Sequence, residues 1–142
     1  MYDPGADAAR RYPHIRIHRR SLGGVDAAAV PARGLIFIER ALDLTGWRCA
    51  VAHELVHLDL GHDACADEAL EARQERRCTA EAARRLIPLG ALLDALVWSH
   101  SISEAADELR VDQQTLCARL DTLDDQERGE LERRVRQIGR CA

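Results

Sequence analysis

The sequence predicts an α+β protein that is mostly helical and has a small β-sheet. Strand-like segments occur within the first 40 residues, and helical patterns fill most of the remaining 142-residue chain. Alanine occurs 23 times and arginine 20 times, and both favour helices, while five residues are aromatic. A chain of this length forms one domain, or one domain with a small addition. We therefore expect an aliphatic, largely helical core.

The N-terminal part is expected to supply the sheet. The first 12 residues are polar, and we expect them to be irregular. The segment His14–Arg19 alternates between apolar and polar residues, which is typical of a half-buried strand. A loop is predicted between Gly23-Gly24 and Pro31. The apolar run Leu35–Ile38 has the length of a strand, so the two strand segments should pair in one small sheet.

Three helices are predicted in the middle of the chain, over Thr45–Leu60, Asp67–Ile87 and Leu89–Trp98. Thr45 can cap the start of the first helix, and Gly61 follows its end. In the second helix, Glu81 is spaced to pair with Arg85 four residues later. Pro88 ends the second helix and opens the third, which is strongly apolar.

The last third of the chain predicts a C-terminal helical extension. Two short helices around a turn at Val111-Asp112 give residues 101–123 a helix-turn-helix-like outline. A final amphipathic helix should end at Gly139 and turn Leu131, Val135 and Ile138 inward, with a dimer seam as the alternative. We expect residues 1–98 to form the core and residues 99–142 the extension.

Composition limits the possible surroundings and partners. The net charge of −4 makes nucleic acid an unexpected partner. The five cysteines are an odd number without a C-x-x-C pair, which argues against a disulfide framework and favours a reducing compartment. No apolar run approaches the roughly 20 residues of a membrane span, and no secretion signal is visible. We expect a cytoplasmic protein without a membrane partner.

One motif indicates chemistry, the H-E-x-x-H of residues 53–57. On a helix, His53 and His57 lie one turn apart on the same face, where their imidazoles can hold one Zn²⁺ ion. Glu54 flanks that face and can accept a proton from an activated water molecule. The alternative is a helix with two surface histidines. Because the motif falls inside a predicted helix with a start and a stop signal, we favour the zinc site.

A catalytic zinc site needs a third protein ligand. His62 lies five residues after His57, which does not fit the metzincin spacing. The next helix offers Glu68, Glu71 and Glu75. We favour Glu75 because its helical neighbours are small and mostly apolar, where a carboxylate needs a charged partner or a metal. The alternative for this residue is an ion pair with a nearby arginine.

The segment from Leu35 to Pro88 resembles the ImmA/IrrE-like metallopeptidase family. The resemblance rests on the strand Leu35–Ile38, on HELVHLDLGH from His53, and on the pattern E-x-x-C-T-x-x-A-x-x-x-L-I-P from Glu75 to Pro88. It implies a zincin-like core of the gluzincin type, with His53, His57 and Glu75 as zinc ligands and Glu54 as catalytic acid/base. Cys78, Thr79 and Glu81 depart from the family pattern, which usually has alanine, asparagine and an aromatic residue there.

Three classes of function compete. The resemblance favours a zinc endopeptidase whose substrate is a helix-turn-helix repressor of a phage or mobile element. The second class is a non-catalytic, zinc-containing regulator that binds a partner, such as an anti-repressor or antitoxin-like protein. The third is a DNA-binding regulator that uses residues 101–123, whose second helix has the single arginine Arg119 for phosphate contacts. His62, Cys49 and Cys78 lie near the motif, but a buried cysteine is usually inert.

Overall fold

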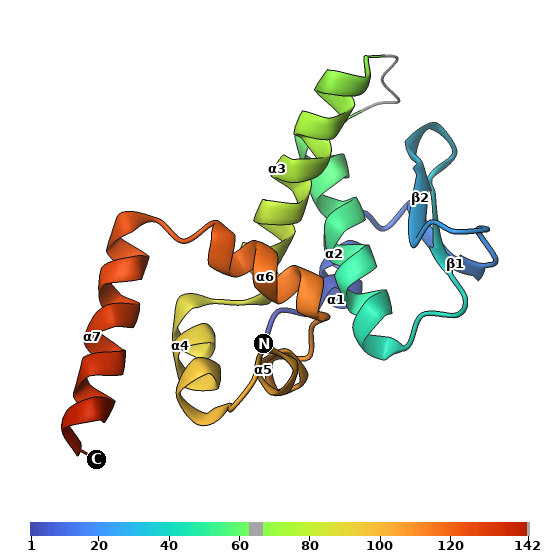
Figure 1. Ribbon diagram of the computed structural model, residues 1–142. Helices are drawn as coiled ribbons and strands as arrows, with labels where there is room; N and C mark the ends of the chain where they lie inside the picture. The colour runs from blue at the N-terminus through green and yellow to red at the C-terminus, as the bar shows by residue number, and fades with distance from the viewer. Residues whose placement is uncertain (63–66, 142) are drawn as a thin grey trace.

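The computed structural model describes residues 1–62 and 67–141 and is mostly helical, with one three-stranded sheet in this part of the chain. The α+β class is therefore confirmed. The sheet lies at one end of the molecule and α7 at the other (Figure 1). In chain order the elements are α1 Pro4–Arg11, β1 Arg16–Arg20, β2 Ala27–Val30, the 3₁₀ helix η1 Pro31–Arg33, β3 Leu35–Glu39, α2 Leu44–Leu60, α3 Glu68–Leu86, α4 Leu89–Trp98, α5 Ile102–Leu109, α6 Gln113–Asp121 and α7 Asp125–Cys141.

The sheet has the order β1-β3-β2, with β3 in the centre. The predicted pairing of the first two strand segments is confirmed, since β1 runs parallel to β3 with Arg16 opposite Leu35. The sequence missed β2, which pairs antiparallel to β3 with Ala27 opposite Ile38. Its run of three alanines has low strand propensity, so pairing with β3 decides its conformation. Ile36 and Ile38 of β3 are fully buried against the helices.

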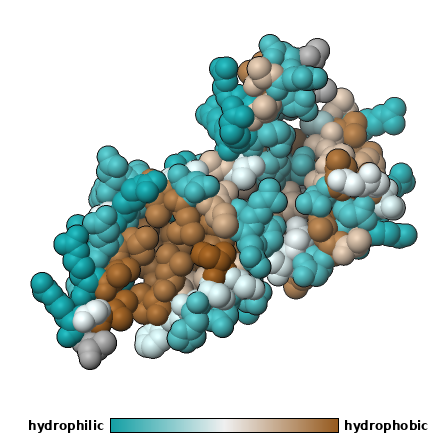
Figure 2. Space-filling view, viewed as in Figure 1, coloured by the Kyte–Doolittle hydropathy of each residue, from teal (hydrophilic) through white to brown (hydrophobic). Residues whose placement is uncertain are grey.

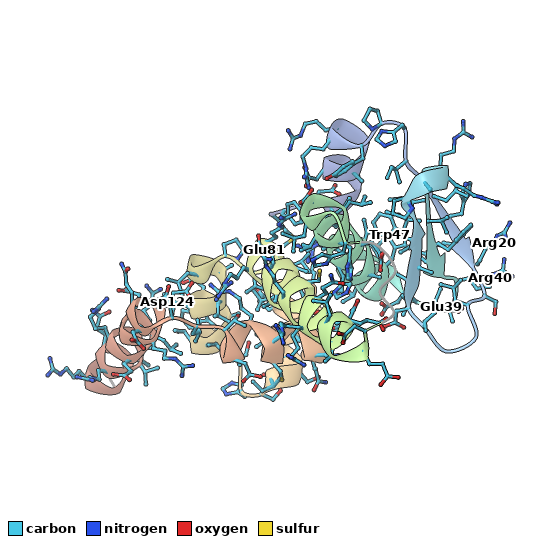
Figure 3. All side chains as sticks on the ribbon, turned by 90° about the horizontal axis from the view of Figure 1, so that it is seen from above. Arg20, Glu39, Arg40, Trp47, Glu81 and Asp124 are labelled. Carbon is cyan, nitrogen blue, oxygen red and sulfur yellow. The ribbon has the colours of Figure 1, made fainter. Side chains whose placement is uncertain are left out.

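The expectation that the first 12 residues are irregular is wrong. Asp3 caps α1 by accepting a hydrogen bond from the Ala6 amide, and Pro4 occupies the first turn. Trp47 of α2 packs its ring against Gly5 so closely that an added Cβ would lie 2.9 Å from a ring carbon. Figure 3 labels Trp47, which lies in the first turn of α2. These contacts between distant segments hold α1 in place, and local sequence cannot indicate them.

Helix α2 lies between two clusters of apolar side chains. Val51 and Leu55 belong to the cluster on the sheet, whereas Cys49, Ala52 and Val56 belong to the cluster among the helices. Asp43 caps the helix in place of the expected Thr45, since its side chain accepts a hydrogen bond from the Gly46 amide at 2.8 Å. The predicted stop is confirmed, because Gly61 takes a left-handed conformation with φ of 65°.

Helix α3 packs along α2, and α4 to α6 complete the second cluster. The predicted pair of Glu81 and Arg85 is confirmed at 3.0 Å. The cluster continues from Cys49 on α2 to Leu116 on α6, so it crosses the predicted boundary between residues 98 and 99. The division into a core and an extension stays a prediction. Within the described residues, no helix is long and apolar enough to cross a membrane.

Helix α7 differs from its prediction. Leu131 packs partly against the second cluster, but Val135 and Ile138 are 58% and 41% exposed. The helix also continues past Gly139 to Cys141. The prediction that Val135 and Ile138 point into the core is wrong because α7 lies at the rim of the molecule. There Arg134 of α7 pairs with Asp94 of α4 at 2.8 Å. Figure 2 shows the resulting hydrophobic area on the face formed by α4 and α7.

Candidate metal centre

The two histidines of the motif lie side by side on α2. Four residues separate them, so the helix places both rings on the side that faces α3. The Nε2 atoms of His53 and His57 are 3.1 Å apart. Partial burial, followed by the neighbouring His53, lowers the pKa of His57, which favours the neutral form of its imidazole. A neutral imidazole is the form that binds a metal.

Glu75 of α3 reaches both histidines. One carboxylate oxygen lies 3.0 Å from His53 Nε2, and the other lies 2.9 Å from His57 Nε2. The structure therefore brings together the three residues that the sequence singled out. The expectation that Glu75 lies on a small, apolar face where its carboxylate needs a partner is wrong, however, because its side chain is 51% exposed. Glu68 and Glu71 lie on exposed positions of the first turn of α3.

The chemistry and spacing of these groups fit a tetrahedral Zn²⁺ ion. Two imidazole nitrogens and one carboxylate oxygen offer three ligand atoms that lie within 4.8 Å of one another. Neighbouring corners of a tetrahedron are ~3.3 Å apart when each metal–ligand distance is ~2.0–2.1 Å. The observed separations of 2.9–3.1 Å are close to that value. His53, His57 and Glu75 are thus able to hold a metal, with the remaining position open for water or substrate.

Glu54 lies next to this group and is almost fully buried. Burial, and then the nearby charge of Glu75, raise the pKa of Glu54 to about 7. A carboxylate with such a pKa exchanges protons readily at neutral pH, which suits a general base. Glu54 therefore has the environment that its predicted catalytic role needs.

An open cavity of about 370 Å³ adjoins the group on the side of His53 and Glu75. Its floor includes His53, Glu54 and Glu75. One wall comes from β2 and the residues just before it, and the opposite wall comes from the start of α6. The N-terminal turn of α6 thus faces the cavity, at Asp112 and Thr115.

The single arginine in the second helix of the helix-turn-helix-like segment is buried. Arg119 of α6 is 2% exposed and donates hydrogen bonds to the carbonyl of Ile87 at 2.9 Å and to the carboxylate of Glu127 at 2.6 Å. Its guanidinium therefore connects α6 to the C-terminal end of α3, at Ile87, and to α7. It is therefore not exposed for contact with a phosphate group.

Two further side chains lie beside the group. His62 follows Gly61, whose left-handed conformation turns the chain back so that the His62 amide bonds to the carbonyl of His57 at 3.0 Å. This turn places His62 Nδ1 3.1 Å from His57 Nδ1, and Cys78 Sγ of α3 is 3.4 Å from His62 Nδ1. The spacing of Cys78 from Glu75 hinted at this position, whereas the approach of His62 needs the turn geometry. Burial raises the pKa of the Cys78 thiol to about 11.

A charged network fixes α2 relative to its neighbours. Asp59, near the end of α2, accepts hydrogen bonds from Arg11 and Tyr12 at the end of α1 and from Arg85 of α3. Each arginine bond measures 2.5 Å. Because α2 carries the histidines and α3 carries Glu75, the Asp59–Arg85 contact helps to set the distance between the ligand atoms.

Histidines and a carboxylate on successive helices, with a buried glutamate beside them, form a group that could hold a metal ion. The family model of the IrrE N-terminal-like domain, which describes a peptidase family, matches residues 10–121. The chain therefore belongs to this family, and the resemblance inferred from its motifs is confirmed. A search of the curated proteins finds no match to the chain.

Proposed function

We propose that the protein is a zinc-dependent endopeptidase with a zincin-like core of the gluzincin type. The observation that carries this proposal is the meeting of His53, His57 and Glu75 around a common point, beside the buried Glu54 and next to an open cavity. The membership in a peptidase family supports it.

The residues of the site have two roles in peptide hydrolysis, metal binding and proton transfer. His53, His57 and Glu75 would hold Zn²⁺, which supplies Lewis acidity toward the scissile carbonyl group and the attacking water. The Glu54 carboxylate takes a proton from that water as its oxygen attacks the carbonyl carbon. Glu54 then gives the proton to the leaving amine as the peptide C–N bond breaks. Its buried setting keeps the proton available for this second transfer.

The edge strand β2 supplies a place for an extended substrate. It lies at the end of the sheet order, and Val25, Asp26 and Ala27 line the cavity. A substrate segment can add to this edge by main-chain hydrogen bonds. The family relationship suggests a protein substrate in the cytoplasm, and we propose a helix-turn-helix repressor of a phage or mobile element.

Substitution of Glu54 tests the proposal. We expect Glu54→Gln to retain about one zinc ion per chain and to lose about 10²–10⁴-fold in cleavage rate, because the amide cannot accept the proton. Metal content is measured by elemental mass spectrometry, and cleavage by the fragment masses of a repressor encoded beside the gene and co-expressed with the chain. Glu71→Gln, at an exposed position of α3, is the control and should retain both zinc and activity.

Unchanged biological activity of a metal-loaded Glu54→Gln protein would contradict the endopeptidase proposal. That result would favour the non-catalytic regulator that binds a partner.

A further inference from the structure

The ring of His57 lies between two groups of possible metal ligands. Its Nε2 atom faces His53 and Glu75, whereas its Nδ1 atom faces His62. His57, His62 and Cys78 form a second set of ligand atoms that lie within 4.8 Å of one another. The two sets share this one imidazole through opposite nitrogens.

Hydrogen bonds alone do not satisfy the second set. Among the residues that the structure describes, His62 Nδ1 has two neighbours, His57 Nδ1 at 3.1 Å and Cys78 Sγ at 3.4 Å. A neutral imidazole nitrogen offers either one lone pair or one proton, so it cannot make a full hydrogen bond to both. A metal ion would accept a lone pair from all three atoms at once.

The spacing and the donor types also fit a metal. With metal–nitrogen distances of ~2.0–2.1 Å and a metal–sulfur distance of ~2.3 Å, neighbouring ligand atoms of a tetrahedral site lie ~3.3–3.6 Å apart. The observed 3.1 and 3.4 Å are near this range. Two imidazoles with one thiolate form a softer set than two imidazoles with a carboxylate, which favours thiophilic ions such as Zn²⁺, Cd²⁺ and Cu⁺.

We propose that His57 Nδ1, His62 Nδ1 and Cys78 Sγ form a second site for a thiophilic metal ion. Binding releases the proton of the Cys78 thiol to solvent, and each imidazole binds through the nitrogen that carries no proton. A neutral His57 ring has one proton on its two nitrogens. A metal on Nδ1 therefore leaves Nε2 protonated, and a metal on Nε2 leaves Nδ1 protonated. For a neutral ring, the two sites therefore exclude each other.

This exclusion gives the second site a regulatory effect. An ion at His62 and Cys78 removes His57 from the set that contains His53 and Glu75. If the proposed function holds, a thiophilic metal at the second site inhibits peptide hydrolysis. The metal site itself does not depend on the proposed function.

Cobalt absorption separates the two sites. A thiolate bound to Co²⁺ gives a near-ultraviolet charge-transfer band that imidazole and carboxylate ligands cannot produce. We expect this band when the metal-free full-length protein is titrated with Co²⁺, and its loss in Cys78→Ser. Cys49→Ser is the matched control, because Cys49 is also buried but belongs to neither set, and it should retain the band.

Variants of the neighbouring ligands test the exclusion. Glu75→Gln weakens the competing site, so we expect it to retain the band and to reach saturation at a lower Co²⁺ concentration. His62→Ala should lose the band. Glu54→Gln should retain it, so loss of peptidase activity can be told apart from loss of the second site.

Several results would overturn the proposal. They are an absent band in folded wild-type protein, a band that persists in Cys78→Ser, and loss of the band in Glu75→Gln. If Cys78→Ser fails to fold, Cys78→Ala provides the same test with the residue that is usual in the family. Circular dichroism establishes folding in each case.

Discussion

Single side chains determine what this centre can do. Glu54 and Glu75 are both glutamates near the same two histidines, yet burial separates their chemistry. Glu75 is half exposed and contacts both imidazoles, so it suits a ligand. Glu54 is buried, and its raised pKa suits proton transfer. The H-E-x-x-H spacing predicted the role of Glu54, whereas the helical neighbours of Glu75 and the family resemblance predicted its role as a ligand. The contact of Glu75 with the two histidines depends on the packing of α3 against α2.

Arg119 shows the same principle away from the centre. Replacing it with methionine leaves the Ile87 carbonyl and the Glu127 carboxylate without their donor. We expect the free energy of unfolding to fall by about 2–4 kcal/mol, since loss of one partner of a buried ion pair costs about 3–5 kcal/mol and Glu127 keeps some contact with water. Urea unfolding measures this change. The exposed Arg133→Met serves as the control, and an equal effect of the two substitutions would argue against a special role of Arg119.

At the scale of elements, local signals predicted the helices with strong start and stop residues. Gly61 and Pro88 marked real boundaries, and the strand at Leu35–Ile38 was found from its apolar run. Apart from the short 3₁₀ helix η1, the elements that were missed are α1 and β2. Both depend on partners far away in sequence, namely Trp47 and Asp59 for α1 and strand β3 for β2. Their own residues, polar in one case and alanine in the other, carry weak signals.

The ion pairs of α1 predict a dependence of stability on pH. Hydrogen bonds from Arg11 lower the pKa of Asp7, and this outweighs the opposite effect of burial. A carboxyl group with a lowered pKa in the folded state stabilises the fold above its unfolded pKa of about 3.9, and the stabilisation is lost as pH falls toward the folded value. We expect Asp7→Asn to cost about 1–3 kcal/mol at pH 7 and less at pH 3.

Urea unfolding at pH 7 and pH 3 tests this expectation. Asp94→Asn is the control, because Asp94 is 64% exposed and its pair with Arg134 lies on the surface. Identical pH profiles of Asp7→Asn and wild type would show that the contacts of Asp7 do not carry the effect.

At the scale of the whole molecule, the cavity is lined by segments that are far apart in the sequence. Its walls come from β2 and from α6, and its floor comes from α2 and α3. The sequence predicted the residues of the floor, because the H-E-x-x-H motif and Glu75 are recognisable as possible metal ligands. It did not predict the walls, since the alanines of β2 and the polar first turn of α6 have no such pattern. The exposed face of α7 was missed for a different reason. Its amphipathic pattern was recognised, but the pattern does not show which elements pack against the apolar face.

The free edge of β2 permits a test of substrate binding. The Glu39 amide bonds to the carbonyl of Asp26 at 2.8 Å, so by antiparallel alternation Ala28 bonds to β3 while Ala29 points its amide to the free edge. We expect Ala29→Pro to lower kcat/KM about three- to tenfold, since one hydrogen bond contributes about 0.5–1.5 kcal/mol. Cleavage rates and Tm are the measurements.

Ala28→Pro is the matched control, because it removes an amide that pairs within the sheet and should lower Tm instead. A folded Ala29→Pro protein with unchanged kcat/KM would show that substrates do not add to this edge.

The family match ends at residue 121, yet Glu127 in α7 binds the guanidinium of Arg119. Arg119 in turn secures the helix whose first turn forms a wall of the cavity. A chain shortened to the matched segment would keep every proposed ligand but lose the carboxylate that neutralises this internal cation. The position of this cavity wall therefore depends in part on a helix that contributes no atom to the candidate metal centre.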